Sequence, residues 1–427
     1  MRFGLAIAGP LLMAAAGAGA QILEFSGDAS LQARWYPESP AFPGQRSSTG
    51  GLVVEPTLYG DIAPSASLTV TALYRYDSAD SRRTHADVRE AYFLTHGDWG
   101  ENSWELRLGL DRVFWGVAEL HNLVDVVNQL DLVEHPRDRP KLGQPMVHLT
   151  VSGDWGIAES FLLPYHRKRT FPGRAGRLRS SLPIDEDGRY ESGAEERHVD
   201  LAFRYSHSVG LLDFGLSAFV GTSREPSFLL GRQYEPSSAS DAPAIPAPGW
   251  DEPVVYAGWD EPVPYYEQIR QFGLDAQLTT EPWLYKMEAV YRSGAVNLLG
   301  QEEDYSAFIF GMERTVYALF GSAADLTFLA EWLYDDRGSR ATSVWANDLF
   351  VAGFLAFNDV RGTELVAGLL GDLRHDYRAL SIELKRRLSD SWSVRVEVIA
   401  NLRVDPQDLT YDGRRDSFLG AGLTFSF

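Results

Sequence analysis

The sequence of 427 residues contains no cysteine, so disulfide bonds, thiolate chemistry and lipid attachment through a cysteine are excluded. Beyond residue 20 it also lacks an apolar run of 18 or more residues, which excludes a membrane-spanning helix there. Basic residues are scarce, because 39 lysines and arginines stand against 59 aspartates and glutamates, giving a net charge of −20. Nucleic-acid binding needs clustered positive charge, so we do not expect it.

The first twenty residues have the layout of a secretory signal peptide. Arg2 precedes a short apolar stretch, which ends in the small residues Ala18, Gly19 and Ala20. We expect cleavage after Ala20 and one mature domain over residues 21–427. An uncleaved N-terminal anchor is the alternative.

Much of the chain alternates between apolar and polar residues, the pattern of β-strands. In the segment 392–404, Arg395 and Glu397 lie on a polar face opposite an unbroken apolar face. The same alternation recurs in three other clear segments: 67–76, 103–111 and 282–292. Because the polar faces carry charges of both signs, a membrane barrel explains the pattern, with lipid outside and a wet lumen inside.

The connections between these segments alternate between short and long, as in outer-membrane barrels. Tryptophans such as Trp104 and Trp283 begin the apolar faces, and tyrosines such as Tyr76 and Tyr291 end them, which predicts two interfacial girdles. We therefore predict an all-β fold: an antiparallel transmembrane β-barrel of about 18 strands (16–18) in the bacterial outer membrane.

The last ten residues alternate up to the final position, with Phe425 and Phe427 on the apolar face. This segment resembles the closing strand of bacterial outer-membrane β-barrels, which implies that Phe425 and Phe427 are read by the barrel-assembly machinery. The layout as a whole resembles general diffusion porins and alginate-export barrels. The stretches RVFWG, VNQLD and PYHRKRTFPGRAGRLR also resemble a proteobacterial outer-membrane family, a resemblance that implies no activity.

The third long connection, residues 114–143, holds the densest group of acids and histidines in the chain. Apolar residues recur in its first half at three- and four-residue steps, which predicts a short amphipathic helix. The apolar side of such a helix must pack against something, and the inner wall of the barrel or a neighbouring loop is available.

In general diffusion porins the third extracellular loop folds into the lumen and carries acids that face basic residues on the wall. The resemblance therefore implies a charged constriction, whose transverse field orders dipolar solutes. The alternative is that the acids only solvate the outer side of a loop helix. The candidate loop acids are Glu119, Asp125 and Asp131, and the candidate wall partners are Arg107, Arg112, Arg395 and Arg403.

A dense basic run follows in the fourth long connection. It predicts either a funnel for anionic solutes or contacts with lipopolysaccharide phosphates at the rim. A locally balanced surface is the alternative, because acids at 185–187 follow closely. The candidate rim residues are Arg167, Lys168, Arg169 and Arg174.

Catalytic and metal-binding patterns are weak. There is no GxSxG motif, and Ser206 and His207 are neighbours on a strand, so they point to opposite faces. His121 and Asp125 share a helical face, but two ligands are too few to indicate a metal site. We therefore expect no catalytic residue, no metal and no cofactor.

The most consistent function is a porin that passes small hydrophilic solutes, passively or with a bias for one class. Three alternatives stay open: a barrel that exports a polysaccharide or another polyanion, a structural or adhesion barrel, and an outer-membrane hydrolase. The expected partners are outer-membrane lipid and lipopolysaccharide. The oligomeric state stays open, because lipid-facing apolar strands hide any interface.

Overall fold

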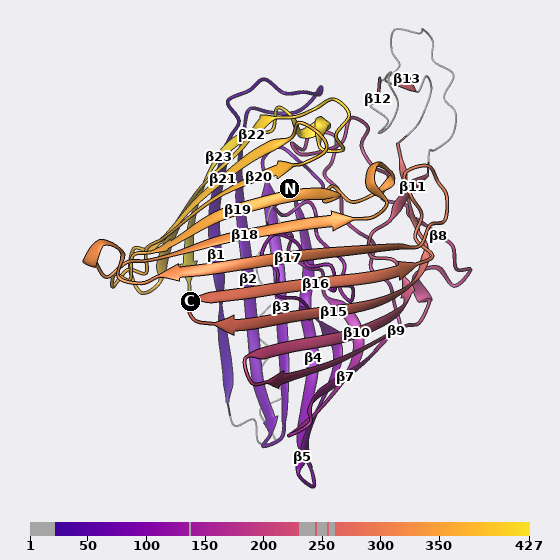
Figure 1. Cartoon of the computed structure of the whole chain (residues 1–427), viewed down its shortest axis with the longest axis vertical. Helices are drawn as coiled ribbons and strands as arrows, with labels where there is room; N and C mark the ends of the chain where they lie inside the picture. The colour runs from indigo at the N-terminus through magenta and orange to yellow at the C-terminus, as the bar shows by residue number, and fades with distance from the viewer. Residues whose placement is uncertain (1–21, 136–137, 230–243, 246–253, 256–260) are drawn as a thin grey trace, which may run out of the picture.

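The computed structural model describes residues 22–135, 138–229, 244–245, 254–255 and 261–427. One antiparallel sheet of 18 strands dominates it (Figure 1). Each strand of this sheet pairs with the next one along the chain, and β23 (Phe418–Ser426) pairs with β1 (Leu23–Trp35) to close the ring. Closure leaves no edge strand with unpaired backbone groups, as a lipid environment requires. The predicted antiparallel barrel of about 18 strands is confirmed.

The remaining barrel strands are between 8 and 16 residues long. They are β2 (Ser48–Ala63), β3 (Ala66–Asp77), β4 (His85–Trp99), β5 (Asn102–Asp111), β6 (Gln144–Gly153), β7 (Gly156–Leu163), β9 (Asp200–Val209), β10 (Leu212–Thr222), β15 (Gln268–Thr280), β16 (Trp283–Ser293), β17 (Tyr305–Val316), β18 (Asp325–Asp335), β19 (Asn347–Ala356), β20 (Glu364–Asp372), β21 (Arg378–Arg387) and β22 (Trp392–Arg403).

Shorter elements lie in the connections. Two small sheets contain β8 (Arg189–Tyr190), β11 (Ser227–Leu229) and β14 (Val263–Tyr266), and β12 (Ala244–Ile245) and β13 (Val254–Val255). The 3-10 helices are η1 (Glu195–Arg197), η2 (Leu319–Gly321), η3 (Gly338–Arg340) and η4 (Tyr411–Gly413). Within the described ranges, no helix has the length and apolar character needed to cross a membrane.

The two faces of the barrel strands differ as the alternation predicts. On β16, Met287 and Tyr291 are exposed on the outside, at 40% and 47%. Lys286, Glu288 and Arg292 on the same strand point inward and are buried. The outer face is therefore apolar where lipid would meet it, and the charges of the strand lie within the ring.

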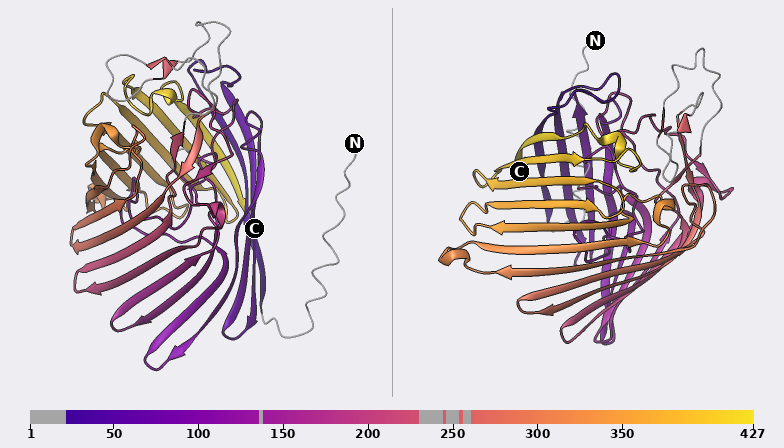
Figure 2. Two further views of the ribbon diagram at one scale, coloured as in Figure 1. Left: turned by 90° about the vertical axis from the view of Figure 1, so that its right-hand side faces the viewer. Right: turned by 45° about the horizontal axis from the view of Figure 1, so that its top comes forward.

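The connections alternate in length around the ring. Tight turns such as 64–65, 100–101 and 154–155 join strands at one rim, and long loops such as 112–143 and 164–199 join them at the other. Figure 2 shows the long loops gathered at the same end of the barrel. We call residues 112–143 the third loop and residues 164–199 the fourth loop, by their order among the long connections.

A cluster of buried apolar side chains lies within the barrel, where the third loop packs on the inner wall. Trp115, Val124 and Val127 of the loop contact inward-facing residues such as Phe161 on β7 and Phe219 on β10. Inward positions from β6 to β17 thus depart from the charged pattern at the place where the loop covers them. Burial of this apolar surface holds the loop inside the ring.

The outer face can be tested by substitution of Met287, which lies near the middle of β16. Met287→Arg would place a charge against lipid, and we expect it to reduce the free energy of folding into vesicles by about 2–4 kcal/mol. Urea titration of the barrel in vesicles measures this change. Tyr317→Arg, in an exposed turn after β17, is the control and should change little. Equal effects of the two variants would contradict the assignment.

Candidate functional site

The third loop is held to the inner wall by a buried glutamate on β16. Oε1 of Glu288 accepts hydrogen bonds from the backbone N–H groups of Val117 and Ala118, at 2.7 and 2.9 Å. Oε2 accepts from the backbone N–H groups of Leu123 and Val124, at 2.7 and 3.4 Å. One carboxylate therefore binds four backbone donors of the loop.

A second glutamate, Glu331 on β18, binds the part of the loop that lies between the two pairs of residues bound by Glu288. Its two oxygens accept hydrogen bonds from the backbone N–H groups of Glu119 and Leu120, at 2.7 and 2.9 Å. Both glutamates have no exposed surface. Hydrogen bonds to a carboxylate are stronger than those between neutral groups, so these contacts fix the path of the loop.

The prediction of a short helix in the third loop is wrong for the described residues. Residues 112–135 form turns, bends and extended segments without a helical turn. The physical reason is that the N–H groups at 117–120, 123 and 124 bond to Glu288 and Glu331 on the wall. A helix would need the same donors for its own carbonyl groups.

Among the three predicted loop acids, Glu119 is the one that reaches open space. Its side chain is 47% exposed, and it accepts a hydrogen bond at 2.7 Å from Lys286 on β16. Lys286 is itself buried and also contacts Glu313 on β17. The pair thus places a loop carboxylate opposite a wall cation.

Asp125 points into the packed region between the loop and the wall, where it pairs with Lys141 of the same loop. Both side chains are largely buried. Burial raises the pKa of the Asp125 carboxyl and lowers the pKa of the Lys141 ammonium group, because each loses its water shell. The pair therefore joins the middle of the loop to its C-terminal end within the lumen.

Asp131 is fully buried in a charged cluster beside β3 and β4. It accepts a hydrogen bond at 2.6 Å from Arg89 and another at 2.6 Å from Thr170 of the fourth loop. The neighbouring Glu134 binds Arg75 at 2.7 Å. The candidate acid thus fastens the third loop to the wall and to the fourth loop.

His85 joins this cluster, and its ring nitrogen, Asp131 and Glu134 offer ligand atoms that lie within 4.8 Å of one another. Three such groups can hold a metal ion in principle. Here both carboxylates are already paired with guanidinium groups, those of Arg89 and Arg75. The charge that a cation would supply is therefore present in the arginines.

Each of the four predicted wall arginines pairs with an acid that was not among the three predicted loop acids. The pairs are Arg107–Glu105 (2.8 Å), Arg112–Glu90 (3.0 Å), Arg395–Asp138 (2.7 Å) and Arg403–Asp376 (2.7 Å). Of the four acids, Asp138 belongs to the third loop. The structure therefore brings Arg395 to the loop through an acid that the sequence reasoning did not select. Arg112, predicted as a wall residue, is itself the first residue of that loop, because β5 ends at Asp111.

The residues that position the loop were not among the predicted site residues: Glu288, Glu331, Arg89 and, as a partner of Glu119, Lys286. Glu288 and Lys286 did stand out as charges on the polar face of the predicted strand 282–292. What the sequence does not show is that these side chains meet loop residues more than 150 positions away.

The four predicted rim cations are each engaged with the protein. Arg167 binds Asp87 at 2.8 Å, Lys168 binds Glu196 at 3.1 Å, Arg169 binds Gln129 at 3.0 Å, and Arg174 pairs with Glu261. Arg174 is the most exposed, with 81% of its side chain accessible. The partners of the basic run are thus three acids and one glutamine, and all but Glu196 lie outside the fourth loop.

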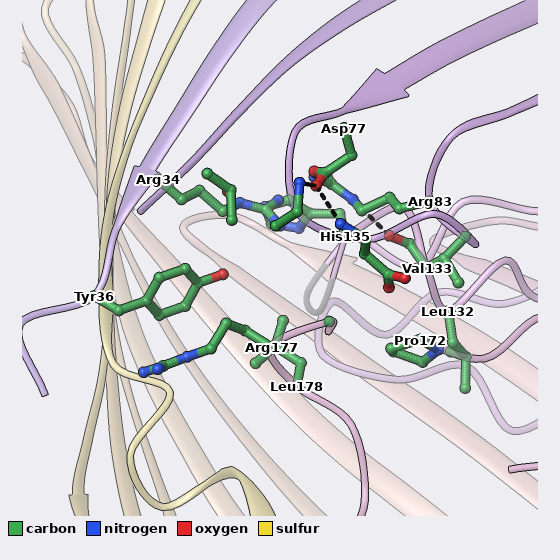
Figure 3. Close-up of a pocket in the computed structure, with 14 residues that line it drawn as sticks. Arg34, Tyr36, Asp77, Arg83, Leu132, Val133, His135, Pro172, Arg177 and Leu178 are labelled. Atoms are coloured by element: carbon green, nitrogen blue, oxygen red, sulfur yellow. Dashed lines mark hydrogen bonds and ion pairs between the residues drawn. The ribbon is translucent and has the colours of Figure 1, made fainter. Parts of the chain in front are cut away.

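The third and fourth loops meet the ends of β1 and β3 around a small cavity of about 30 Å³ (Figure 3). Arg83 donates hydrogen bonds to the carbonyl oxygen of Val133 and to Asp77, at 2.8 and 2.5 Å. Arg177 of the fourth loop lies over the ring of Tyr36, 4.3 Å from its centroid. These contacts tie both loops to the rim.

The predicted assembly residues lie at the seam of the barrel. The backbone N–H of Phe427 donates to the carbonyl oxygen of Gly27 at 3.0 Å, beside the pairing of β23 with β1. The ring of Phe427 lies 5.4 Å from that of Phe25 and 6.1 Å from that of Phe425. Recognition by an assembly machinery stays a prediction, as does the signal peptide at 1–20, which lies outside the described residues.

Comparison with known proteins shows no family for this chain. No protein-family model and no curated protein matches the sequence. Matching solved structures include two mutants of the porin from Rhodopseudomonas blastica, each 11% identical over 95% of this chain and 100% of the porin. Their TM-scores are 0.42 and 0.43, too low to support a conclusion about function.

The class of protein follows from the barrel itself. A closed ring of 18 antiparallel strands, apolar outside and charged inside, with tight turns at one rim and long loops at the other, is built to cross a membrane. The chain is a porin-like β-barrel of the outer-membrane type. The candidate functional site consists of the described residues that line the lumen and those of the third loop inside it.

The hold of Glu288 on the loop is testable by hydrogen exchange. In Glu288→Gln one oxygen becomes an NH₂ group, so two loop donors lose their acceptor at a cost of about 1–3 kcal/mol each. We expect the amides of Val117, Ala118 and Leu123 to exchange at least tenfold faster. Glu313→Gln on β17 is the matched control, because Glu313 pairs with Lys286 and, among the described residues, accepts no hydrogen bond from a loop amide. Unchanged exchange in Glu288→Gln would contradict the tether.

Protonation of His121 makes the stability of the third loop depend on pH. Burial and the neighbouring Arg139 lower the pKa of His121 to about 4, with further charges at Glu225, Arg292 and Arg169 around it. Because the folded pKa lies below its ordinary value of 6.5, the stability contributed by the neutral ring is present above pH 6.5 and is lost as pH falls towards 4.

We therefore expect amide protection factors in the third loop to fall between pH 6.5 and 4, by the equivalent of about 1–2 kcal/mol. In His121→Gln this part of the pH dependence should disappear. Protection factors already correct for the intrinsic effect of pH on exchange. An identical profile in wild type and variant would show that another group is responsible.

Proposed function

We propose that the chain is an outer-membrane channel for the passive or solute-biased passage of small hydrophilic molecules, narrowed by its third loop. The observation that carries this proposal is the position of the loop within the ring, held by Glu288 and Glu331 to one side of the wall. A loop fixed against one side of a wide barrel narrows the passage and sets its chemistry.

Space for solutes on the side of the tight turns supports a passage. One cavity of about 610 Å³ is lined by charged and polar residues of β5 to β7, such as Arg107, His148 and Glu159. Another of about 530 Å³ lies next to it, where Arg204 and Asp275 face each other. Both cavities reach the beginning of the third loop. A vestibule below the loop that is lined by charged and polar side chains suits hydrophilic solutes.

The charges at the loop favour small solutes of mixed charge. Glu119 on the loop faces Lys286 on the wall, and Asp138 on the loop faces Arg395. We propose that these two pairs make the transverse field of the constriction. Asp125 and Asp131 are buried in ion pairs, and we assign them the role of holding the loop in place.

Export of a polyanion is less well supported. Such a path needs many unpaired positive charges along the lumen, but arginines of the inner wall such as Arg204 are neutralised by neighbouring acids, here by Asp275 at 2.7 Å. Contacts of exposed Arg174 with lipopolysaccharide phosphates are compatible with the channel proposal. No arrangement of described residues supports a reaction, so the proposed role is passage without catalysis.

The channel proposal is tested in planar lipid bilayers with the purified barrel. We expect stepwise conductance, and we expect Glu119→Gln to reduce the preference for cations, measured as a shift of the reversal potential in a salt gradient. The reason is that the variant removes the exposed acid of the constriction and leaves Lys286 in place.

Asp376→Asn is the matched control. This acid lies in the short loop 373–377, away from the constriction, and pairs with exposed Arg403 at the end of β22. It should leave selectivity unchanged. Absence of any conductance from correctly folded barrel would reject the channel. Equal selectivity in Glu119→Gln and wild type would reject the proposed constriction but not the channel.

A further inference from the structure

A third large cavity, of about 550 Å³, lies on the extracellular side of the lumen, between the long loops and the inner wall of β19 to β22. We call it the upper cavity. It differs from the polar cavities near the tight turns because apolar and aromatic side chains provide most of its lining. Those from the wall are Phe350, Leu370, Ala379 and Ile399, and those from the loops include Leu120, Leu132, Phe171, Leu178 and Trp345.

The apolar wall of this cavity is continuous across neighbouring strands. Phe350 on β19 pairs in register with Leu370 on β20, and Leu370 pairs with Ala379 on β21. All three belong to the inward face, which elsewhere in the barrel carries charges such as Glu288 and Lys286. Apolar inward positions between β6 and β17 are covered by the third loop. On β19 to β22 they face open space instead.

One cation in the lining has no acid of its own. Arg139 of the third loop lies over the ring of Trp345, 4.8 Å from its centroid, and contacts a ring nitrogen of His121 at 3.3 Å. Among the described residues no carboxylate lies within ion-pair distance of it. Glu225, which acts on Arg139 electrostatically, is already bound to Arg292 at 2.7 Å.

Other charged groups of the lining have protein partners. Arg179 donates to the carbonyl oxygens of Arg174 and Ser180, at 3.0 and 2.7 Å. Asp416 is paired with Arg177 at 2.8 Å, and Asp412 accepts a hydrogen bond from the backbone of Ser181 at 2.7 Å. Arg139 is therefore the group of the upper cavity whose charge is left for a ligand.

Arg139 also adopts a backbone conformation that side chains rarely take, with φ of +38°. Such a conformation costs free energy and persists where its surroundings hold it. The guanidinium group of Arg139 lies over the ring of Trp345, and both residues line the cavity. The lining thus combines a large apolar surface with one uncompensated, oriented cation.

We propose that the upper cavity binds a small amphipathic anion, with an aromatic or other apolar body against β19 to β22 and a carboxylate or sulfonate at Arg139. An arginine next to an apolar surface recognises such a ligand, because it bonds the anion while the body leaves water. The inference deepens the proposed channel function, on which it rests, by naming a class of solute for the extracellular half of the lumen.

The experiment uses the full barrel in lipid nanodiscs and isothermal titration calorimetry, with empty nanodiscs as the baseline. The probes are 2-naphthylacetate and its neutral analogue 2-naphthylethanol. We expect saturable binding of 2-naphthylacetate, weakened at least tenfold in Arg139→Gln because a charged hydrogen bond is lost. Wild type should bind 2-naphthylethanol more weakly than 2-naphthylacetate. The affinity for 2-naphthylethanol should be nearly the same in Arg139→Gln as in wild type.

Two further variants define the site. Ala379→Trp places a large ring in the upper cavity and should abolish binding of both probes. Arg403→Gln, which removes an exposed arginine outside the cavity, is the matched control and should bind as wild type does. Binding confined to the lipid, or equal affinity of wild type and Arg139→Gln for 2-naphthylacetate, would overturn the proposal.

Conductance of the same preparations separates this proposal from the channel. Saturable binding that requires Arg139, in a barrel that carries no current, would retain the site and reject the channel. Current without saturable binding would retain the channel and reject the site. Conductance or unchanged heat-modifiable gel mobility also shows that each variant is folded.

Discussion

The bonds from Glu288 and Glu331 to the backbone of the third loop are the constraint on which the interior of this barrel depends. An extended loop inside a barrel presents N–H groups with no neighbouring strand to accept them, and a buried donor without an acceptor is costly. Two carboxylates on the wall meet six of these donors. In turn, the donors replace the water that the carboxylates lose on burial.

Other features of the lumen follow from that placement. With the loop against β16 and β18, Trp115 and Val124 can cover the apolar inner wall, and Asp131 can reach Arg89 on β4. The same placement leaves the wall of β19 to β22 uncovered and orients Arg139 towards it. One set of hydrogen bonds therefore determines both the part of the inner wall that the loop covers and the part that it leaves uncovered.

Much of the barrel was predictable, because a membrane imposes a simple rule on each strand. Met287 and Glu288 are neighbours on β16, and the change from exposed to buried between them is the period of two seen in the sequence. The closing strand and the alternation of turns and loops are local patterns as well. The third loop was less predictable, since its apolar spacing fits a helix but its backbone bonds to residues far along the chain.

The same limit applies to the charged residues of the site. The sequence marked Glu119, Asp125 and Asp131 as alike, whereas the structure exposes Glu119 and buries the other two in ion pairs with Lys141 and Arg89. The structure also pairs Arg395 with Asp138, which was not among the predicted loop acids. Whether a loop charge faces the lumen depends on the fold of the whole loop, which its spacing does not contain.

The sequence by itself determined a closed antiparallel barrel of about 18 strands and the two faces of its clearest strands, because lipid and water sort side chains one residue at a time. Only the tertiary structure decided how the third loop lies, which acids reach open space and where an apolar cavity stays uncovered. Those features come from contacts such as Glu288 with Val117, across more than 150 residues, and long-range contacts leave no periodic trace in a sequence.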